Sequence, residues 1–183
     1  MGAFGKAMGK RFDVIVVGGA LNGLTAGLAL GGHRARRPLS LAIVDIRDPR
    51  QNLSGDRDAR ASAITASSKR MFEALGMWDQ DSRHCQEMRE IIVTDGGTPD
   101  NRPVLLQFGE AAASACMVEN HHLLAGLLNI VEKSPSITLI TGHGVVSQSF
   151  APGLAKLTLA NGEQLSSSLV VAADGGKSAF REA

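Results

Sequence analysis

The chain has 183 residues, of which 44% are hydrophobic and 20% charged, and its formal net charge is +1. This length and composition suit one globular domain or part of a larger one. The small charge and an aromatic content of 4%, without tyrosine, argue against nucleic-acid recognition by electrostatic steering or base stacking. No apolar run reaches the roughly 18 residues of a membrane span. We therefore expect a cytoplasmic protein, with peripheral contact at the inner membrane left open.

The chain begins with a basic, glycine-rich segment, MGAFGKAMGKR, over residues 1–11. It lacks the apolar region and the small-residue cleavage site of a secretory signal. We expect this segment to be a disordered leader and residues 12–183 to form the folded part.

A strand is predicted at 12–18 and a helix at about 21–32, joined by the turn GGALNG. The turn nearly matches the dinucleotide fingerprint G-x-G-x-x-G, with Ala20 in place of the second glycine. Gly18 would permit the tight turn, and Gly23 would let the helix pack closely on the strand. The helix N-terminus would offer N–H groups and a positive dipole end to a pyrophosphate. The alanine methyl narrows the approach to the phosphates without closing it, provided that φ at this residue is negative.

A second buried strand, LSLAIVDI at 39–46, carries Asp45 near its end, 22 residues after Gly23. An acidic side chain there can accept hydrogen bonds from ribose hydroxyls and would disfavour a 2′-phosphate. These residues favour FAD or NAD over NADP. The alternative is a structural glycine-rich turn in an unrelated α/β protein, with Asp45 as a helix cap.

The rest of the chain alternates between helical and strand patterns. Helices are predicted at about 62–76 and at 118–133, the first ending at Gly76. Asn161-Gly162 predicts a hairpin turn. Short strands are predicted within the segments 88–96, 103–109, 136–142, 144–150 and 154–175. The pattern predicts an α/β fold with inserted antiparallel strands.

Two stretches, DARASAITASSKRMFEALGMW at 58–78 and LVVAADGGKSAFREA at 169–183, resemble the FAD-dependent aromatic hydroxylases. Within these class A flavoprotein monooxygenases the resemblance is to the ubiquinone-biosynthesis branch. The stretches MVENHHLLAGLL and ITLITGHGVV resemble further segments of that family, in the same order. The resemblance implies a truncated Rossmann-like FAD-binding domain of the glutathione-reductase type. It also implies that the segment at about 85–115 is an excursion into the substrate domain.

The resemblance further implies which residues bind the cofactor. Arg60 would lie against the flavin cofactor, and Asp174-Gly175 would touch the pyrophosphate and ribose of FAD, with Ser178 and Arg181 completing the family spacing. From the residues alone, Arg60 could also be a solvated loop arginine, and Asp174 could cap a turn. The expected cofactor-binding residues are Gly18, Gly19, Ala20, Leu21, Asn22, Gly23, Asp45, Arg60, Ala61, Asn120, Val145, Asp174 and Gly175.

As function, the resemblance implies a monooxygenase in which NAD(P)H reduces FAD and a flavin C4a-hydroperoxide oxygenates a small aromatic quinone precursor. No catalytic side chain is assigned, because the flavin carries the chemistry. The family's second Gly-Asp segment has no counterpart here, so we expect the chain to be inactive alone. The alternatives are a non-catalytic FAD- or nucleotide-binding module and an inactive truncated remnant. A dehydrogenase using NAD would leave Arg60 and Asp174-Gly175 without a role. Association with a biosynthetic complex stays open, and no oligomeric state is assigned.

Two pairs of residues are interpreted as structural. His121 and His122 point about 100° apart on a helix, so we expect a partly exposed helix face and no metal ligand set. Cys85 and Cys116 are far apart in the sequence and lie in no metal-binding spacing. We therefore expect reduced thiols and neither a disulfide nor a zinc site.

Overall fold

The computed structural model describes residues 9–53, 60–78, 84–96, 103–109 and 115–176, together with 178 and 180. At its centre lies a parallel sheet with the strand order β13-β2-β3-β9. Its strands are β2 (Val14–Val17), β3 (Leu41–Asp45), β9 (Ile137–Thr141) and β13 (Leu169–Ala172). Strands of a parallel sheet are covered on both faces, which explains the unbroken apolar runs VIVV and LAIV. The expected α/β fold is confirmed.

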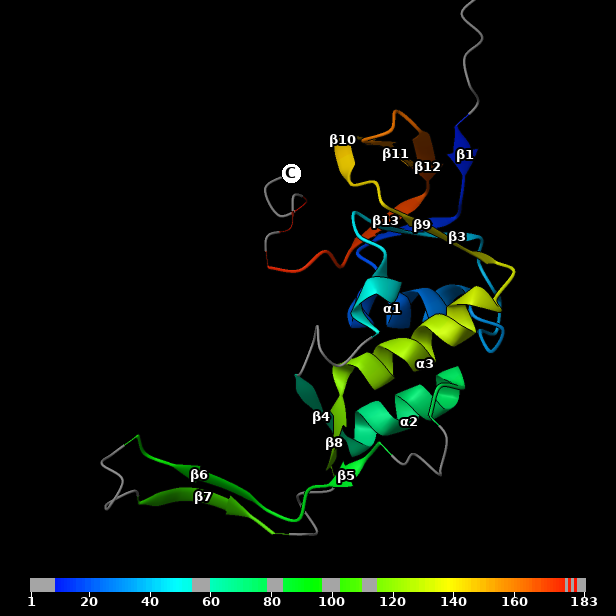
Figure 1. The fold of residues 1–183 in the computed structure, drawn as a ribbon. Helices are drawn as coiled ribbons and strands as arrows, with labels where there is room; N and C mark the ends of the chain where they lie inside the picture. Colours follow the sequence, from blue (N-terminus) through cyan, green and yellow to red (C-terminus); the bar gives the residue numbers. More distant parts are fainter. Residues whose placement is uncertain are drawn as a thin grey trace, which may run out of the picture.

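Helices cover one face of this sheet (Figure 1). They are α1 (Leu21–Gly31) and α3 (Asn120–Glu132), which pack against each other. The alternation along β2 separates the two cores, because successive side chains point to opposite faces. Val14 and Val16 share a buried cluster with Leu24 and Leu127, whereas Ile15 belongs to the cluster on the other face.

A second sheet covers that other face, with the order β1-β12-β11-β10. It comprises β1 (Lys10–Arg11), β10 (Val145–Ala151), β11 (Leu154–Leu159) and β12 (Gln164–Ser167). The predicted Asn161-Gly162 turn joins β11 to β12, and Gly162 has φ +84°. The expectation of a disordered leader is wrong for Lys10 and Arg11. Their strand pairs with β12, and the Lys10 ammonium lies 3.0 Å from the Glu163 carboxylate. Residues 1–8 lie outside the described part.

A third sheet, β4-β8-β5, corrects the predicted helix at 62–76. Its strands are β4 (Ala61–Thr65), β5 (Gln86–Glu87) and β8 (Ala115–Glu119). The helix α2 (Ala66–Leu75) begins only after β4 and ends at Gly76, which has φ +80°. Residues 61–65 are extended because they pair with β8, a strand that the sequence pattern did not indicate.

The two cysteines form a disulfide, so the expectation of reduced thiols is wrong. Pairing of β5 with β8 places Gln86 opposite Met117 and brings Cys85 within 5.5 Å of Cys116, Cα to Cα. The residues are 31 positions apart, and only the strand pairing makes them neighbours. Among the described residues, no helix has the length and apolar character that crossing a membrane requires.

The predicted hairpin-like strands are present as β6 (Ile91–Thr94) and β7 (Val104–Phe108). Figure 1 shows this antiparallel pair extending away from the other elements. Its large apolar side chains are unusually exposed: Ile92, Val93, Val104, Leu105, Leu106 and Phe108. The assignment of this excursion to a substrate domain stays a prediction.

Candidate cofactor-binding site

The turn between β2 and α1 requires glycine at two positions. Gly18 has φ +114°, and a Cβ there would lie 2.3 Å from the carbonyl oxygen of Ala173. A Cβ on Gly23 would lie 1.8 Å from the carbonyl oxygen of Gly18. Neither position can accept a side chain without moving the backbone, so the first and last glycines of the fingerprint act as the pattern predicts.

Ala20 occupies the middle position of the fingerprint in an extended conformation, with φ −86° and ψ −172°. The condition for tolerating alanine there, a negative φ, is therefore met. Ala20 is exposed and immediately precedes α1, whose first turn carries no acidic residue and no side-chain cap. This helix end combines a positive dipole with N–H groups that lack helical partners, which is the usual environment for a bound phosphate.

Asp45 ends β3 beside this turn. Its Oδ2 accepts a hydrogen bond from the Gly19 N–H at 2.6 Å, and its Oδ1 accepts one from the Arg47 N–H at 2.8 Å. Each carboxylate oxygen has a second lone pair, so Asp45 can still accept hydrogen bonds from ribose hydroxyls. The two backbone bonds fix the orientation of the carboxylate at the edge of the site.

Two adjoining pockets, of about 370 and 300 Å³, lie around this turn. They share Ala20, Asp45, Arg47, Ala173 and Gly175. Most of the expected cofactor-binding residues line one or both: Gly18, Gly19, Ala20, Leu21, Asn22, Asp45, Arg60, Asn120, Val145, Asp174 and Gly175. Their assignment as cofactor ligands stays a prediction.

Two expected residues lie outside these pockets. Gly23 is buried under the turn, where it permits close packing, and Ala61 lines a different pocket beside His122. Arg181 lies outside the described residues, while the Ser178 N–H donates to the Gly175 carbonyl oxygen at 3.2 Å.

Arg60 is held at the first pocket by the strand pairing that the sequence pattern did not indicate. The Asn120 N–H donates to the Arg60 carbonyl oxygen at 2.9 Å. The Ser62 hydroxyl donates to the Asn120 side-chain oxygen at 2.6 Å, across 58 residues of sequence. Two of the segments that resemble the hydroxylase family, one at the start of β4 and one at the start of α3, therefore meet at one wall of the pocket.

Arg47, Pro49 and Asn52 also line the first pocket and were not assigned to it from the sequence. Pro49 is the first residue and Asn52 the last residue of a short 3-10 helix, η1 (Pro49–Asn52). The sequence position of Arg47 could have indicated its place in the pocket. It lies two residues after Asp45, at the carboxyl end of a parallel strand, where ligands bind.

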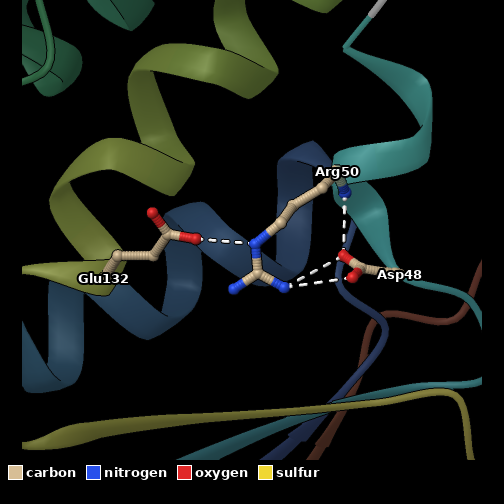
Figure 2. Close-up of polar contacts among 3 residues, drawn as sticks. All are labelled: Asp48, Arg50 and Glu132. Atoms are coloured by element: carbon tan, nitrogen blue, oxygen red, sulfur yellow. Dashed lines mark hydrogen bonds and ion pairs between the residues drawn. The ribbon is translucent and has the colours of Figure 1, made fainter.

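Arg50, in η1, forms an ion pair with Glu132 of α3 (Figure 2). Its Nε lies 2.7 Å from Glu132 Oε1, and its Nη1 lies 3.1 Å from both Asp48 carboxylate oxygens. These hydrogen bonds, that to Glu132 first, raise the pKa of Arg50 above its usual value. The contacts join η1, which lines the pocket, to α3.

His121 and His122 are both half-buried, in agreement with the expected partly exposed helix face. His121 Nδ1 lies 3.3 Å and His122 Nε2 lies 3.9 Å from Glu119 Oε2. The rings of His84 and His122 stack at a centroid distance of 3.5 Å. Burial, followed by the charges of His121 and His84, lowers the pKa of His122. Although the two Cβ atoms point in different directions, the side-chain conformations place one nitrogen of each ring within 4 Å of the same carboxylate oxygen.

The residues around the turn fit a dinucleotide diphosphate. The N-terminus of α1, whose first turn has no acidic side chain, faces the first pocket. Arg47 and Arg60 supply positive charge, and Asp45 supplies an acceptor at the end of the adjacent strand.

Comparison with known proteins identifies the class. The chain belongs to the FAD binding domain family, which it matches over residues 11–183. FAD as the cofactor is thereby confirmed.

Relatives of this chain are ubiquinone hydroxylases. It is 32% identical over 176 residues to ubiquinone hydroxylase UbiL of Rhodospirillum rubrum, covering 94% of this chain and 39% of that protein. It is 28% identical to 3-demethoxyubiquinol 3-hydroxylase of Escherichia coli, covering 93% of this chain and 43% of that protein. The chain thus spans about two fifths of the length of these relatives.

Solved structures share the fold. FqzB superposes with a TM-score of 0.72 at 21% identity, covering 93% of this chain and 37% of that one. p-Nitrophenol 4-monooxygenase PnpA from Pseudomonas putida superposes with a TM-score of 0.72 at 16% identity, over 94% of this chain and 43% of that one. The flavin-dependent monooxygenase PieE, solved in complex with FAD and substrate, gives 0.67 at 21% identity, over 92% and 31%.

Proposed function

We propose that this chain is the FAD-binding portion of an NAD(P)H- and O2-dependent monooxygenase that hydroxylates an aromatic quinone precursor in ubiquinone biosynthesis. The observation that carries the proposal is the pocket at the α1 N-terminus, where Arg47, Arg60 and Asp45 converge. The names of the related hydroxylases support the reaction class and the pathway.

In this proposal the N–H groups at the start of α1 and the two arginines bind the diphosphate of FAD. Charge-assisted hydrogen bonds from guanidinium groups to phosphate are among the stronger polar contacts in proteins. Asp45 binds the ribose of the adenosine half, and Val145 in the second pocket packs against the adenine. Asp174 and Gly175 contact the pyrophosphate and ribose of FAD.

When bound, FAD would supply the redox chemistry, accepting electrons from NAD(P)H and activating O2 for transfer to the ring. The side chains of this chain bind and orient the cofactor, and we assign none of them as an acid, base or nucleophile. Asp45, held by two backbone N–H groups, presents a fixed acceptor and needs no reorganisation on binding.

We propose that the β6–β7 hairpin belongs to a substrate domain completed by further sequence. A two-stranded hairpin alone is marginally stable in water, and its exposed apolar side chains need a partner sheet. The relatives are more than twice as long as the matched region, which is consistent with this view. The 183-residue chain alone would then bind FAD without hydroxylating a substrate. A cytoplasmic location, with peripheral contact at the inner membrane or with a biosynthetic complex, belongs to the same proposal.

The first experiment is a titration of the 183-residue chain with FAD, followed by flavin fluorescence. Arg60→Met should weaken binding by about tenfold or more, because it removes a charge-assisted contact to phosphate. Arg70→Met, an exposed arginine on α2 outside the pocket, is the matched control and should bind as the unmodified chain does. Absence of FAD affinity in the folded, unmodified chain would contradict the proposal.

A second experiment separates the monooxygenase from a non-catalytic module. The chain is fused to the C-terminal part of the Rhodospirillum rubrum relative, so that the protein has that enzyme's full length. Oxidation of NAD(P)H stimulated by a quinone precursor, with a hydroxylated product, would support the enzyme. Tight FAD binding without either signal would favour the module.

A further inference from the structure

Side chains with metal-ligand chemistry gather at the start of α3, at the edge of the first pocket, which His121 also lines. We propose that Glu119, His121 and His122 form a binding site for a divalent transition-metal ion such as Zn2+. One carboxylate oxygen and one nitrogen from each ring all lie within 4.8 Å of one another. The proposal rests on these residues and does not depend on the proposed hydroxylase function.

The distances agree with tetrahedral coordination. Metal–ligand bonds of about 2.0–2.2 Å place tetrahedral ligand atoms about 3.4 Å apart. Glu119 Oε2 lies 3.3 Å from His121 Nδ1 and 3.9 Å from His122 Nε2. Small side-chain rotations would therefore bring Glu119 Oε2 and the two ring nitrogens, which all lie within 4.8 Å of one another, to one ion.

The donor types select the kind of ion. Two imidazoles and one carboxylate suit zinc and other first-row transition metals, whereas Mg2+ and Ca2+ prefer oxygen ligands alone. His121 Nδ1 is buried and makes no hydrogen bond among the described residues, although Glu119 Oε2 lies 3.3 Å from it. A metal ion would give this nitrogen a partner, and the Glu119 charge would partly neutralise the ion.

Neighbouring residues hold the ligands in place. The His84 ring stacks on His122, and the disulfide between Cys85 and Cys116 ties the segment carrying His84 to β8. Glu119 is the last residue of β8, and α3, which carries His121 and His122, begins at the next residue. The Glu119 side chain is 59% exposed, which leaves an entry path and room for a water as fourth ligand.

The test is calorimetric titration of the chelator-treated 183-residue chain with Zn2+. One ion per chain should bind, and His122→Ala and Glu119→Gln should each weaken binding by about tenfold or more. His33→Ala, an exposed histidine elsewhere in the chain, is the matched control and should leave binding unchanged. Circular dichroism of each variant establishes that it is folded.

A second measurement needs no variant. Co2+ added to the unmodified chain should broaden the imidazole proton resonances of His121, His122 and His84 and leave those of His33 and His143 sharp. It should also produce the visible absorption of low-coordinate cobalt. Either of two results would overturn the site: no ion bound at millimolar Zn2+, or broadening that spares His121 and His122.

Discussion

The Asp45 carboxylate, expected to face the ribose, accepts a hydrogen bond from the Gly19 N–H in the glycine-rich turn at 2.6 Å. Its other oxygen accepts from the Arg47 N–H at 2.8 Å, so the end of β3 and the turn after β2 are joined by one side chain. Asp45 therefore shapes the turn besides facing the proposed ribose. A Cβ on Gly19 would approach Asp45 Cβ to 3.1 Å, which shows how close the two segments lie.

Asp45→Asn should destabilise the chain and weaken FAD binding together. The asparagine NH2 would face one of two backbone N–H donors, leaving a donor without an acceptor, at a cost of about 1–3 kcal/mol. Urea unfolding and FAD titration measure the two effects. Asp13→Asn is the matched control, because Asp13 accepts one backbone N–H, from Ser40, and an amide oxygen can replace it. Equal losses for both variants would show that the paired bonds of Asp45 have no special role.

Substitutions at Ala20 test where the pyrophosphate lies. Ala20→Gly should leave FAD affinity equal or better, while Ala20→Val should abolish it, because the branched side chain fills the approach to the α1 N-terminus. Ala29→Val, on an exposed position of the same helix, controls for the lower helix propensity of valine. Full FAD affinity in Ala20→Val would mean that the phosphates do not lie against this turn.

Gly23→Ala should destabilise the fold strongly, because its Cβ would lie 1.8 Å from the Gly18 carbonyl oxygen. We expect a loss of about 1–3 kcal/mol or more in the free energy of unfolding, as in other overpacked sites. Gly126→Ala in α3 is the comparison, since its Cβ would meet the flexible Met77 side chain at 3.1 Å and the Met77 carbonyl oxygen only at 4.0 Å. That variant should be near neutral, because the propensity gain of about 1 kcal/mol offsets the contact. Chemical denaturation ranks the two.

The Arg50–Glu132 ion pair should contribute little to stability despite its short distance of 2.7 Å. Both side chains are 45% exposed, and such pairs are worth about 0–1 kcal/mol. A double-mutant cycle with Arg50→Met and Glu132→Gln should give a coupling energy in that range, decreasing with added salt. A larger, salt-insensitive coupling would indicate that η1 depends on this contact.

Reduction of the Cys85–Cys116 disulfide should lower the free energy of unfolding. For a loop of 31 residues the loss of chain entropy corresponds to about 2–4 kcal/mol. Urea denaturation with and without dithiothreitol measures this difference, and a Cys85→Ser, Cys116→Ser double variant should show no response to the reductant. Two reactive thiols in the unfolded, non-reduced chain would contradict the pairing.

The sequence by itself determined the parts that depend on local periodicity and turn chemistry. The apolar runs of β2 and β3, the glycines around Ala20, and the helix α3 all follow from spacing within a few residues. The Asn161-Gly162 hairpin likewise follows from the turn preferences of its own two residues. The resemblance that directed attention to FAD rests on such local segments in a fixed order.

Tertiary structure alone decided features that join distant segments. Residues 61–65 form a strand because they pair with β8, and this pairing outweighs the helical pattern of their sequence. The same β4–β8 pairing set Asn120 against Arg60, and the pairing of β5 with β8 set Cys85 beside Cys116. These contacts depend on strand register across tens of residues, which neighbouring side chains do not specify. The physical reason is that a residue's own propensity is worth tenths of a kcal/mol, while pairing and burial are worth several.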